Sequence, residues 1–474
     1  MRTLHLSCKV RHLNQMAGQK RKIQYSARRQ KCKENRQRQK TENSEECKND
    51  DRRLYFPQEM HPGSYAVEYR RQNPIADVSS AKSCRKRRYA FWVSYCGQKY
   101  SGMQLNEGVA TIEAELERAL FKAGGISDAN YGFLQKIGWS RAARTDKGVH
   151  AAGQLVTAKL SFDSKSSEEQ KDEEIQSFVD KVNTFLPSDV RVMDMVTVTK
   201  NFNAKMSCDY RTYEYLIPTF VFAARQQDPK KENQSDDSVL ETTMSHLHLI
   251  HQQAYRMSSE QYNDLNRILS KFEGSHNFHN FTSKLLPTSP KCQRYIVSFQ
   301  ADQPFVPSNS SFEWIRLRVK GQSFLLHQIR KMIGTSVDLC AGVAESNVIE
   351  RAMLLDKMDL PKAPSVGLYL SEAHFEKYNL KLEQTSGQHN QVHPNLKLTA
   401  KQSVASTVEN FKKMYIFPHI FEQEITQRTY GTWLETLCSM PFTYHSEMYA
   451  AWKTGKEEEA MRRNGVKAPL RQTQ

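Results

Sequence analysis

The sequence predicts an α+β fold made of two halves of similar size. In both halves, segments that alternate like strands follow segments with the 3.6-residue period of a helix. A polar stretch at residues 226–242, QQDPKKENQSDDSVLET, separates the two halves. The sequence has no run of about 18 apolar residues, so we expect no membrane-spanning helix and no membrane partner.

The first half begins with an expected strand at 89–95, YAFWVSY, in which aromatic and small residues alternate. Thr111 is expected to cap a helix that ends at Gly124 and Gly125, since threonine favours the N-cap and glycine the end of a helix. The other expected elements of this half are strands at 156–162, 190–199 and 211–217 and a helix over 175–186.

The second half repeats this mixture of strands and helices. The periodicity predicts helices at 261–272 and 324–339, and strands at 295–300 and 312–320. Residues after 380 are mostly polar, but one apolar island predicts a helical segment near 405–438.

The first 86 residues form a basic arm without clear periodicity, and we expect them to be largely disordered. Residues 1–88 hold 23 Lys and Arg against 9 Asp and Glu, so most of the net charge of +16 lies there. An acid-free start resembles a mitochondrial presequence, while QKRK and CRKRR resemble nuclear import signals. A solubilising or RNA-contacting tail is a third interpretation, and the sequence does not separate the three.

The stretch GWSRAARTDKGVHAAGQ, residues 138–154, places Asp146 on an expected turn. Asp, Lys and Gly suit the corner of a hairpin for conformational reasons alone. Alternatively, Arg141, Arg144 and Lys147 hold a reactive carboxylate in its ionised form. The spacing by itself favours the plain turn.

The segment CDYRTYEYLIP places Arg211, Tyr213, Tyr215 and Ile217 on one face of an expected strand. An aromatic core face is the commoner explanation of such a pattern. The alternative is a platform on which a nucleobase stacks, with Arg211 near a phosphate.

The segment GQSFLLHQIRKMIG, residues 321–334, predicts a helix with one apolar face. His327, Arg330, Lys331 and Gly334 fall on its other side. This side is either a solvated basic face or the lining of a cleft in which Arg330 pairs with a carboxylate.

Histidines cluster twice, and the nine cysteines are scattered. The clusters are His246, His248 and His251, and then His276 with His279. Neither cluster is joined by other metal ligands at a familiar spacing, so we expect no metal site. The cysteines fit free thiols in a reducing compartment.

Motifs for phosphate loops, dinucleotide binding and serine hydrolases are missing from the sequence, which leaves a cation-flanked aspartate as the main chemical signal.

Several of these segments, in order, resemble the TruA family of pseudouridine synthases, in its eukaryotic tRNA pseudouridine synthase 1 branch. RAARTDKGVHAAGQ matches the signature around the family's catalytic aspartate, and YRTYEYLIP and GQSFLLHQIRKMIG match its second and third motifs. FEGSHNFHNFTS, APSVGLYL and HFEKYN also match that branch. The resemblance covers about 89–379. Cys96 departs from it, because the wider family often has Asp there.

The resemblance implies the pseudouridine synthase fold, in which two α+β halves share a mixed, mostly antiparallel sheet with a central basic cleft and helices outside. The domain organisation that follows has five segments: a basic arm at 1–86, the first half of the catalytic domain at 87–225, an insertion at 226–242, the second half at 243–380, and a polar extension at 381–474.

The resemblance also implies the reaction: isomerisation of uridine to pseudouridine in tRNA, without a cofactor. Messenger and small nuclear RNAs stay open as further substrates. It places the catalytic aspartate at Asp146, the active-site tyrosine at Tyr213, and the arginine that pairs with the carboxylate at Arg330. The target uridine must leave its stack to be reached, and Arg144 is expected to hold the displaced nucleotide.

Further RNA contacts are expected from the basic residues near these motifs, since phosphate contacts position a protein on RNA. They are Lys136, Arg141, Lys147, His150, Arg211, His327 and Lys331. The protein is expected to be a monomer or a homodimer and to reside in the nucleus, the mitochondrion or both.

Two other classes of protein compete with this interpretation. One is an RNA-binding protein that uses the same cleft without catalysis, which the intact Asp146, Tyr213 and Arg330 argue against. The other is an aspartyl-phosphate phosphotransferase, suggested only by TDKG, which would require Mg²⁺ and further acidic ligands.

Overall fold

The computed structural model describes residues 86–439, except 107, 163–167, 226–248, 284, 309, 387–397 and 399–401. Nearly all of the predicted basic arm, the insertion at 226–242 and much of the predicted extension after 380 therefore lie outside the described residues. His246 and His248 lie outside them too.

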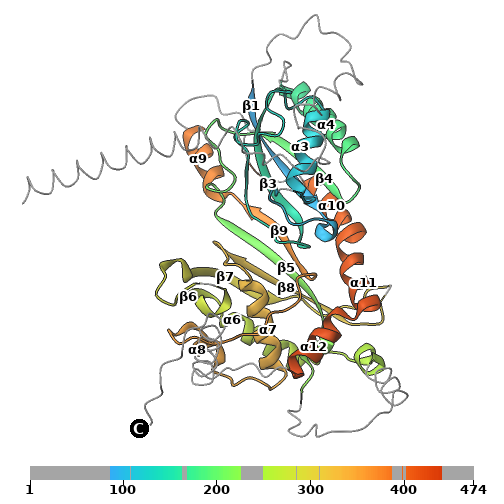
Figure 1. Ribbon diagram of the computed structural model, residues 1–474, viewed down its shortest axis with the longest axis vertical. Helices are drawn as coiled ribbons and strands as arrows, with labels where there is room; N and C mark the ends of the chain where they lie inside the picture. The colour runs from blue at the N-terminus through green and yellow to red at the C-terminus, as the bar shows by residue number, and fades with distance from the viewer. Residues whose placement is uncertain are drawn as a thin grey trace, which may run out of the picture. The chain divides into compact units, whose positions relative to one another are not determined.

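A single nine-stranded sheet forms the centre of the described chain (Figure 1). Its order is β4-β1-β3-β9-β5-β8-β7-β6, with β2 paired to β3 beside this path. The pairings are antiparallel except for β3 with β9, which is parallel. The predicted mixed, mostly antiparallel sheet is thus confirmed. The strands are β1 Arg87–Tyr95, β2 Ser140–Arg141, β3 His150–Leu160, β4 Val190–Thr197, β5 Tyr210–Pro218, β6 Gly274–Asn277, β7 Gln293–Ala301, β8 Trp314–Gly321 and β9 Leu368–His374.

Strand β5 lies in the middle of the sheet between two strands that come much later in the chain. Tyr213 is opposite Val319 of β8 on one side and Leu370 of β9 on the other. Strand β9 in turn pairs with the start of β3, where His150 is opposite Tyr369. The chain segments around residues 150, 213 and 370 therefore meet at the centre of the sheet.

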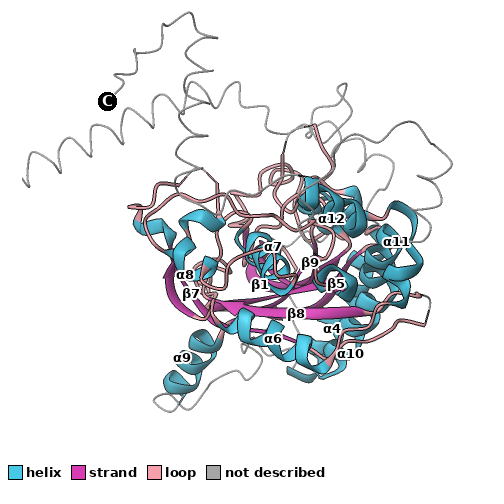
Figure 2. Cartoon of the chain, turned by 90° about the horizontal axis from the view of Figure 1, so that it is seen from below, coloured by secondary structure: helices cyan, strands magenta, loops and turns pink. Residues whose placement is uncertain are grey.

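Helices pack around this sheet, as the view from below shows (Figure 2). No helix among the described residues is long and apolar enough to span a membrane. The α-helices are α3 Ile112–Lys122, α4 Glu168–Phe185, α6 Ser259–Ser270, α7 Gln328–Cys340, α8 Val348–Met353, α9 Glu376–Ser386, α10 Gln402–Phe411, α11 Phe417–Gln427 and α12 Thr429–Ser439. Short helical turns are η2 Gly97–Lys99, η3 Thr219–Phe222, η4 His279–Phe281 and η5 Pro290–Cys292, and η7 Lys412–Ile416 is a π-helical turn.

Local signals explain where several helices begin and end. Thr111 caps α3 by accepting a hydrogen bond from the Ala114 amide, and Gly124 follows the helix with a φ of +90°. Ser258 and Gln261 form a reciprocal capping box at the start of α6. Helix α7 begins only at Gln328, four residues later than predicted, because His327 before it adopts a left-handed backbone with φ +63° and ψ +3°.

The last helices of the described chain cover part of the sheet. Trp314 of β8 is fully buried, with its ring centroid 4.7 Å from that of Phe421 in α11 and 5.8 Å from that of Tyr430 in α12. The Tyr430 hydroxyl also donates a hydrogen bond of 2.7 Å to the Leu216 carbonyl in β5. Helices α11 and α12 are thus fastened to the central strands.

Candidate active site

Asp146 lies in the loop between β2 and β3, which pair antiparallel as the two arms of a hairpin. The Val149 amide donates to the Asp146 carbonyl over 3.1 Å and closes a four-residue turn. Gly148, the third residue of this turn, has φ +76°, a backbone that type II turns require and glycine adopts readily. The predicted hairpin turn at Asp146 is therefore confirmed.

Buried hydrogen bonds hold this loop from within. The Gln154 side chain accepts from the Ala143 amide over 3.1 Å and donates to the Ala143 carbonyl over 2.8 Å. The hydroxyls of Tyr95 and Thr145 lie 2.7 Å apart, directly before Asp146. Because the side chains of Tyr95, Thr145 and Gln154 are buried, these hydrogen bonds are shielded from water. They fix the backbone of the loop that carries Asp146.

Backbone from the turn after β1 supports the loop from outside. A Cβ atom at Gly97 would lie 2.2 Å from the Val149 carbonyl oxygen, so only glycine permits this close approach. The Gly97 amide donates to Nδ1 of His150 over 2.9 Å, and the Met103 amide donates to the Thr145 carbonyl over 3.2 Å.

The loop presents three charged side chains to solvent. Arg144, Asp146 and Lys147 are all exposed, and within the described part of the chain none of them makes a side-chain hydrogen bond or ion pair. A rigid backbone that carries unpaired charges is suited to a ligand, because the charges remain available and the loop loses little conformational freedom on binding.

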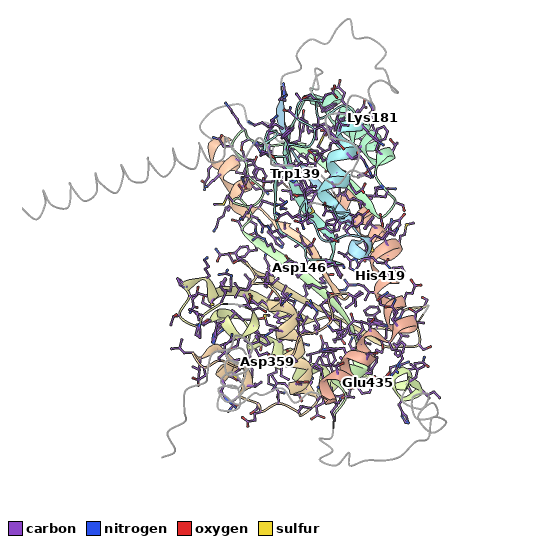
Figure 3. The ribbon with its side chains drawn as sticks, in the orientation of Figure 1. Trp139, Asp146, Lys181, Asp359, His419 and Glu435 are labelled. Carbon is purple, nitrogen blue, oxygen red and sulfur yellow. The ribbon has the colours of Figure 1, made fainter. Side chains whose placement is uncertain are left out.

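Tyr213 and Arg330, predicted from distant segments, lie within electrostatic range of Asp146. Burial raises the pKa of Tyr213 to about 12, and the charge of Asp146 adds to this increase. Burial lowers the pKa of Arg330, while the negative charge of Asp146 opposes that change. No ion pair joins Asp146 to Arg330, although the structure describes both residues. Figure 3 shows Asp146 near the middle of the described chain.

Each of these two side chains is held by its own neighbours. Tyr213 is 8% exposed, and its ring meets that of Phe324 edge-on at a centroid distance of 5.3 Å. Arg330 is half-buried, and its Nε donates to the Ala363 carbonyl over 2.6 Å. The site is therefore built from the β2–β3 loop, the centre of β5 and the first turn of α7.

His327 also lies near Asp146, and its backbone is strained. A φ of +63° is uncommon for a residue with a side chain, and such strain gathers at functional sites. Burial lowers the pKa of His327, Lys362 and Arg330 lower it further, and Asp146 opposes them. The His327 side chain is therefore mainly neutral at neutral pH.

The other predicted RNA-contacting residues have contacts inside the protein. Arg141 pairs with the buried Glu113, and Arg211 donates to the Ala142 and Gln322 carbonyls, which ties the loop to the segment before α7. Lys136 is exposed and lies 3.8 Å from the centre of the Phe133 ring. Lys331 donates from its Nζ to the Asn280 carbonyl.

His150 is fully buried, and burial lowers its pKa to about 3. Its Nδ1 accepts the Gly97 amide, and its ring lies 5.3 Å from that of His419 in α11. With no exposed surface it has no access to an RNA phosphate, so we do not carry it into the proposed RNA interface. Its imidazole instead joins the loop to the turn after β1.

Sequence reasoning did not single out Tyr95, Gln154 or Glu113. Gln154 and Tyr95 hold the Asp146 loop, and Glu113 accepts hydrogen bonds from Trp139 and the Leu105 amide besides pairing with Arg141. Only the position of Gln154 inside the RAARTDKGVHAAGQ motif pointed to it. In the described part of the chain, no group of three or more His, Cys, Asp or Glu residues could hold a metal ion.

Comparisons with known proteins define the class of this protein. A family model described as tRNA pseudouridine synthase matches residues 268–376, which include β8, α7 and β9. The chain is also 37% identical over 364 residues to "Pseudouridylate synthase 1 homolog" of Mus musculus, an alignment that covers 76% of each chain. The chain therefore belongs to the tRNA pseudouridine synthase family, whose members are isomerases.

Further relatives carry closely related names. "Pseudouridylate synthase 1 homolog" of Homo sapiens is 38% identical over 348 residues, covering 73% of this chain and 71% of the human protein. "tRNA pseudouridine synthase 1" of Kluyveromyces lactis is 29% identical over 438 residues, covering 81% of this chain and 74% of the yeast protein.

Proposed function

We propose that the protein isomerises specific uridines of tRNA to pseudouridine, with Asp146 as the nucleophile. One observation carries this proposal: Tyr213 and Arg330, from two segments far from Asp146 in the sequence, each interact electrostatically with Asp146. A carboxylate within electrostatic range of an aromatic hydroxyl and a guanidinium is equipped for nucleophilic attack on a flipped nucleotide.

The RNA lies, in this proposal, in a basic cleft at the centre of the sheet, between the two halves of the catalytic domain at 87–225 and 243–380. The exposed Arg144 and Lys147 and the first turn of α7 support this placement, because they put positive charge around Asp146. The target uridine leaves its stack, and Arg144 holds the displaced nucleotide or its phosphate.

The reaction is an internal rearrangement and needs no oxidant, reductant or phosphate donor. The bond between C1′ and N1 of the uridine breaks as Asp146 attacks C1′ or promotes the loss of the base. The base turns and C5 bonds to C1′, which displaces the Asp146 carboxylate where it has attacked C1′; the proton on C5 leaves and N1 gains a proton. The exchange balances in atoms and electrons, so we propose that no cofactor takes part.

Tyr213 and Arg330 have distinct parts in this scheme. Tyr213 packs against the uracil and serves in proton transfer. Arg330 supplies the positive charge that faces the Asp146 carboxylate. In this proposal the exposed, unpaired Asp146 side chain forms the ion pair with Arg330 when the substrate is bound.

The remaining predicted cations contribute contacts to the RNA backbone. Lys147 and Lys136 are exposed, and His327 lies beside Asp146, which supports contacts close to the target nucleotide. Arg141 and Arg211 are partly engaged inside the protein, so they act mainly by shaping the loop. Messenger and small nuclear RNAs are proposed as further substrates, the nucleus or mitochondrion as the compartment, and a monomer or homodimer as the active form.

Release of tritium from tRNA tests this function. We expect wild-type protein to release tritium from tRNA labelled at C5 of its uridines, and to do so equally well in the presence of EDTA. A protein that binds tRNA without releasing tritium is a non-catalytic binder. Loss of activity on adding EDTA would support a metal-dependent enzyme, such as a phosphotransferase, instead.

A further inference from the structure

Three lysines gather around the start of α7 and the neighbouring turn η4, and the nearby Asp359 forms no ion pair with any of them. Lys331 is the next residue of α7, and Lys357 and Lys362 lie in the segment that joins α8 to β9. Each of the three is described by the structure, and none of them forms an ion pair. The half-buried Arg225, by contrast, is paired with Asp338.

Two of these lysines point at consecutive backbone carbonyls. The Lys331 Nζ donates to the Asn280 carbonyl over 3.1 Å, and the Lys357 Nζ donates to the His279 carbonyl over 3.2 Å. Because the two acceptors are neighbours in η4, the two ammonium groups lie close together on the same turn. Both lysines are half-buried.

Lys362 is brought to the start of α7 by backbone contacts. Arg330 Nε donates to the Ala363 carbonyl over 2.6 Å, and the Ala363 amide donates to the Arg330 carbonyl over 3.0 Å. A Cβ atom at Gly334 would lie 2.4 Å from the Pro361 carbonyl oxygen, so glycine lets this segment lie directly against the helix. Lys362 itself is exposed.

The segment that carries Lys357 is fixed by a buried amide. Asn280 is fully buried; its Nδ2 donates to the Ala352 and Asp356 carbonyls over 3.0 and 2.8 Å, and its Oδ1 accepts from the Met358 amide over 2.9 Å. Both the amino and the carbonyl group of the Asn280 side chain are thus hydrogen-bonded. The backbone that carries Lys357 is therefore fixed by buried hydrogen bonds.

Neighbouring positive groups repel Lys331 and Lys362, whereas Asp359 attracts Lys331 and Lys357. Burial lowers the pKa of Lys331, and Lys357 and Lys362 lower it further, whereas Asp359 opposes them. Arg330 likewise lowers the pKa of Lys362. Positive groups that repel one another and are partly removed from water are unfavourable without a counter-anion. A bound anion would remove this repulsion.

We propose that Arg330, Lys331, Lys357 and Lys362 form a phosphate track, which binds backbone phosphates of the nucleotides next to the target uridine. The track begins at Arg330, continues through Lys331 and Lys362 at the start of α7, and ends at Lys357, whose Nζ bonds the His279 carbonyl of η4. It rests on the proposed function, because it takes RNA as the ligand. Asp359 is the acidic group close to it, and Figure 3 labels both Asp359 and Asp146.

The salt dependence of tRNA binding tests the track. Each phosphate neutralised by a cation contributes about 0.7 to 0.9 to the slope of log affinity against log salt. We expect Lys357→Gln and Lys362→Gln each to reduce the slope by about that amount, and the double variant by about twice as much. Lys181→Gln is the matched control: Lys181 is exposed, lies on α4 and is labelled in Figure 3. It should leave the slope unchanged.

Tritium release separates the failure of this inference from the failure of the proposed function. At saturating tRNA, Lys181→Gln should release tritium at the wild-type rate, because Lys181 lies outside the proposed track and the active site. Unchanged slopes, with wild-type tritium release intact, would refute the track and leave the isomerase standing. A wild-type protein that releases no tritium refutes the function, while the slopes still report on the track. Melting temperatures exclude misfolded variants.

Discussion

At the scale of single residues, the site depends on how three side chains are held. Asp146 is exposed and unpaired in the described chain, whereas Tyr213 and Arg330 are buried or half-buried with partners of their own. The proposed nucleophile is therefore free to meet the substrate, and the two groups proposed to assist it are held by their neighbours. Such preorganisation is what catalysis requires, since little has to rearrange as charge develops.

Replacing Arg330 by methionine should reduce catalysis far more than tRNA affinity. The variant removes the cation that we propose to pair with Asp146, and we expect kcat to fall by roughly 100-fold or more while Kd rises only a few-fold. Single-turnover tritium release and filter binding measure the two quantities. Because the Arg330 bond to Ala363 is also lost, thermal melting must show a folded variant. A defect confined to binding would contradict the ion-pair role.

At the scale of elements, the Asp146 loop is positioned by contacts that local sequence does not reveal. The sequence predicted the hairpin, the cap at Thr111 and the helix end at Gly124, because each depends on neighbouring residues. It could not predict that Gln154 would bond Ala143 or that Tyr95 would bond Thr145, since those contacts arise only once β1 and β3 pair. The start of α7 was misplaced because a left-handed histidine has no strong local signal.

Gly97 should tolerate no side chain, because a Cβ atom would lie 2.2 Å from the Val149 carbonyl oxygen. We expect Gly97→Ala to displace the loop and to lower the free energy of unfolding by on the order of 1–3 kcal/mol. Its tritium release should fall accordingly. Gly108→Ala is the control: that position is open but has φ +70°, so it carries only the backbone penalty of about 1–2 kcal/mol. Equal activity of the two variants would argue against a steric role for Gly97.

Glu424 in α11 should make the stability of the protein depend on pH. Glu424 is fully buried, and burial raises its pKa from 4.5 to about 7. The Tyr430 and Gly431 amides donate hydrogen bonds to its carboxylate, and these bonds oppose the rise in pKa. The folded state thus binds the proton more tightly than the unfolded state. The resulting stabilisation is complete below about pH 4.5 and is lost as the pH rises through about 7.

Denaturant unfolding at pH 5 and pH 8 measures this effect. Wild-type protein should lose on the order of 1–3 kcal/mol more than Glu424→Gln between the two pH values. Glutamine keeps an acceptor oxygen for the Tyr430 amide but cannot ionise. The buried Glu117, whose pKa also rises to about 7, should leave some pH dependence in the variant. Identical losses for both proteins would show that Glu424 stays neutral or solvated.

At the scale of the whole molecule, the sheet brings distant motifs together. Strand β5 pairs with β8 and β9, so the Tyr213 segment reaches both the start of α7 and the strand beside the Asp146 loop. The order of motifs along the chain was enough to predict the family, and the comparisons confirm it. The pairing itself was not predictable from periodicity, because β5 and β8 are about 100 residues apart. Lys357 and Lys362 belonged to no motif and were found only through their contacts.

The most direct test of the central claim compares wild-type protein with Asp146→Asn in single-turnover tritium release from tRNA. Asparagine keeps the size of the side chain but is not a nucleophilic carboxylate. Asp180→Asn, an exposed change on α4, is the control. The account predicts full release by the wild type and the control, and no detectable release by Asp146→Asn with tRNA binding retained. Release by Asp146→Asn at the wild-type rate would contradict it.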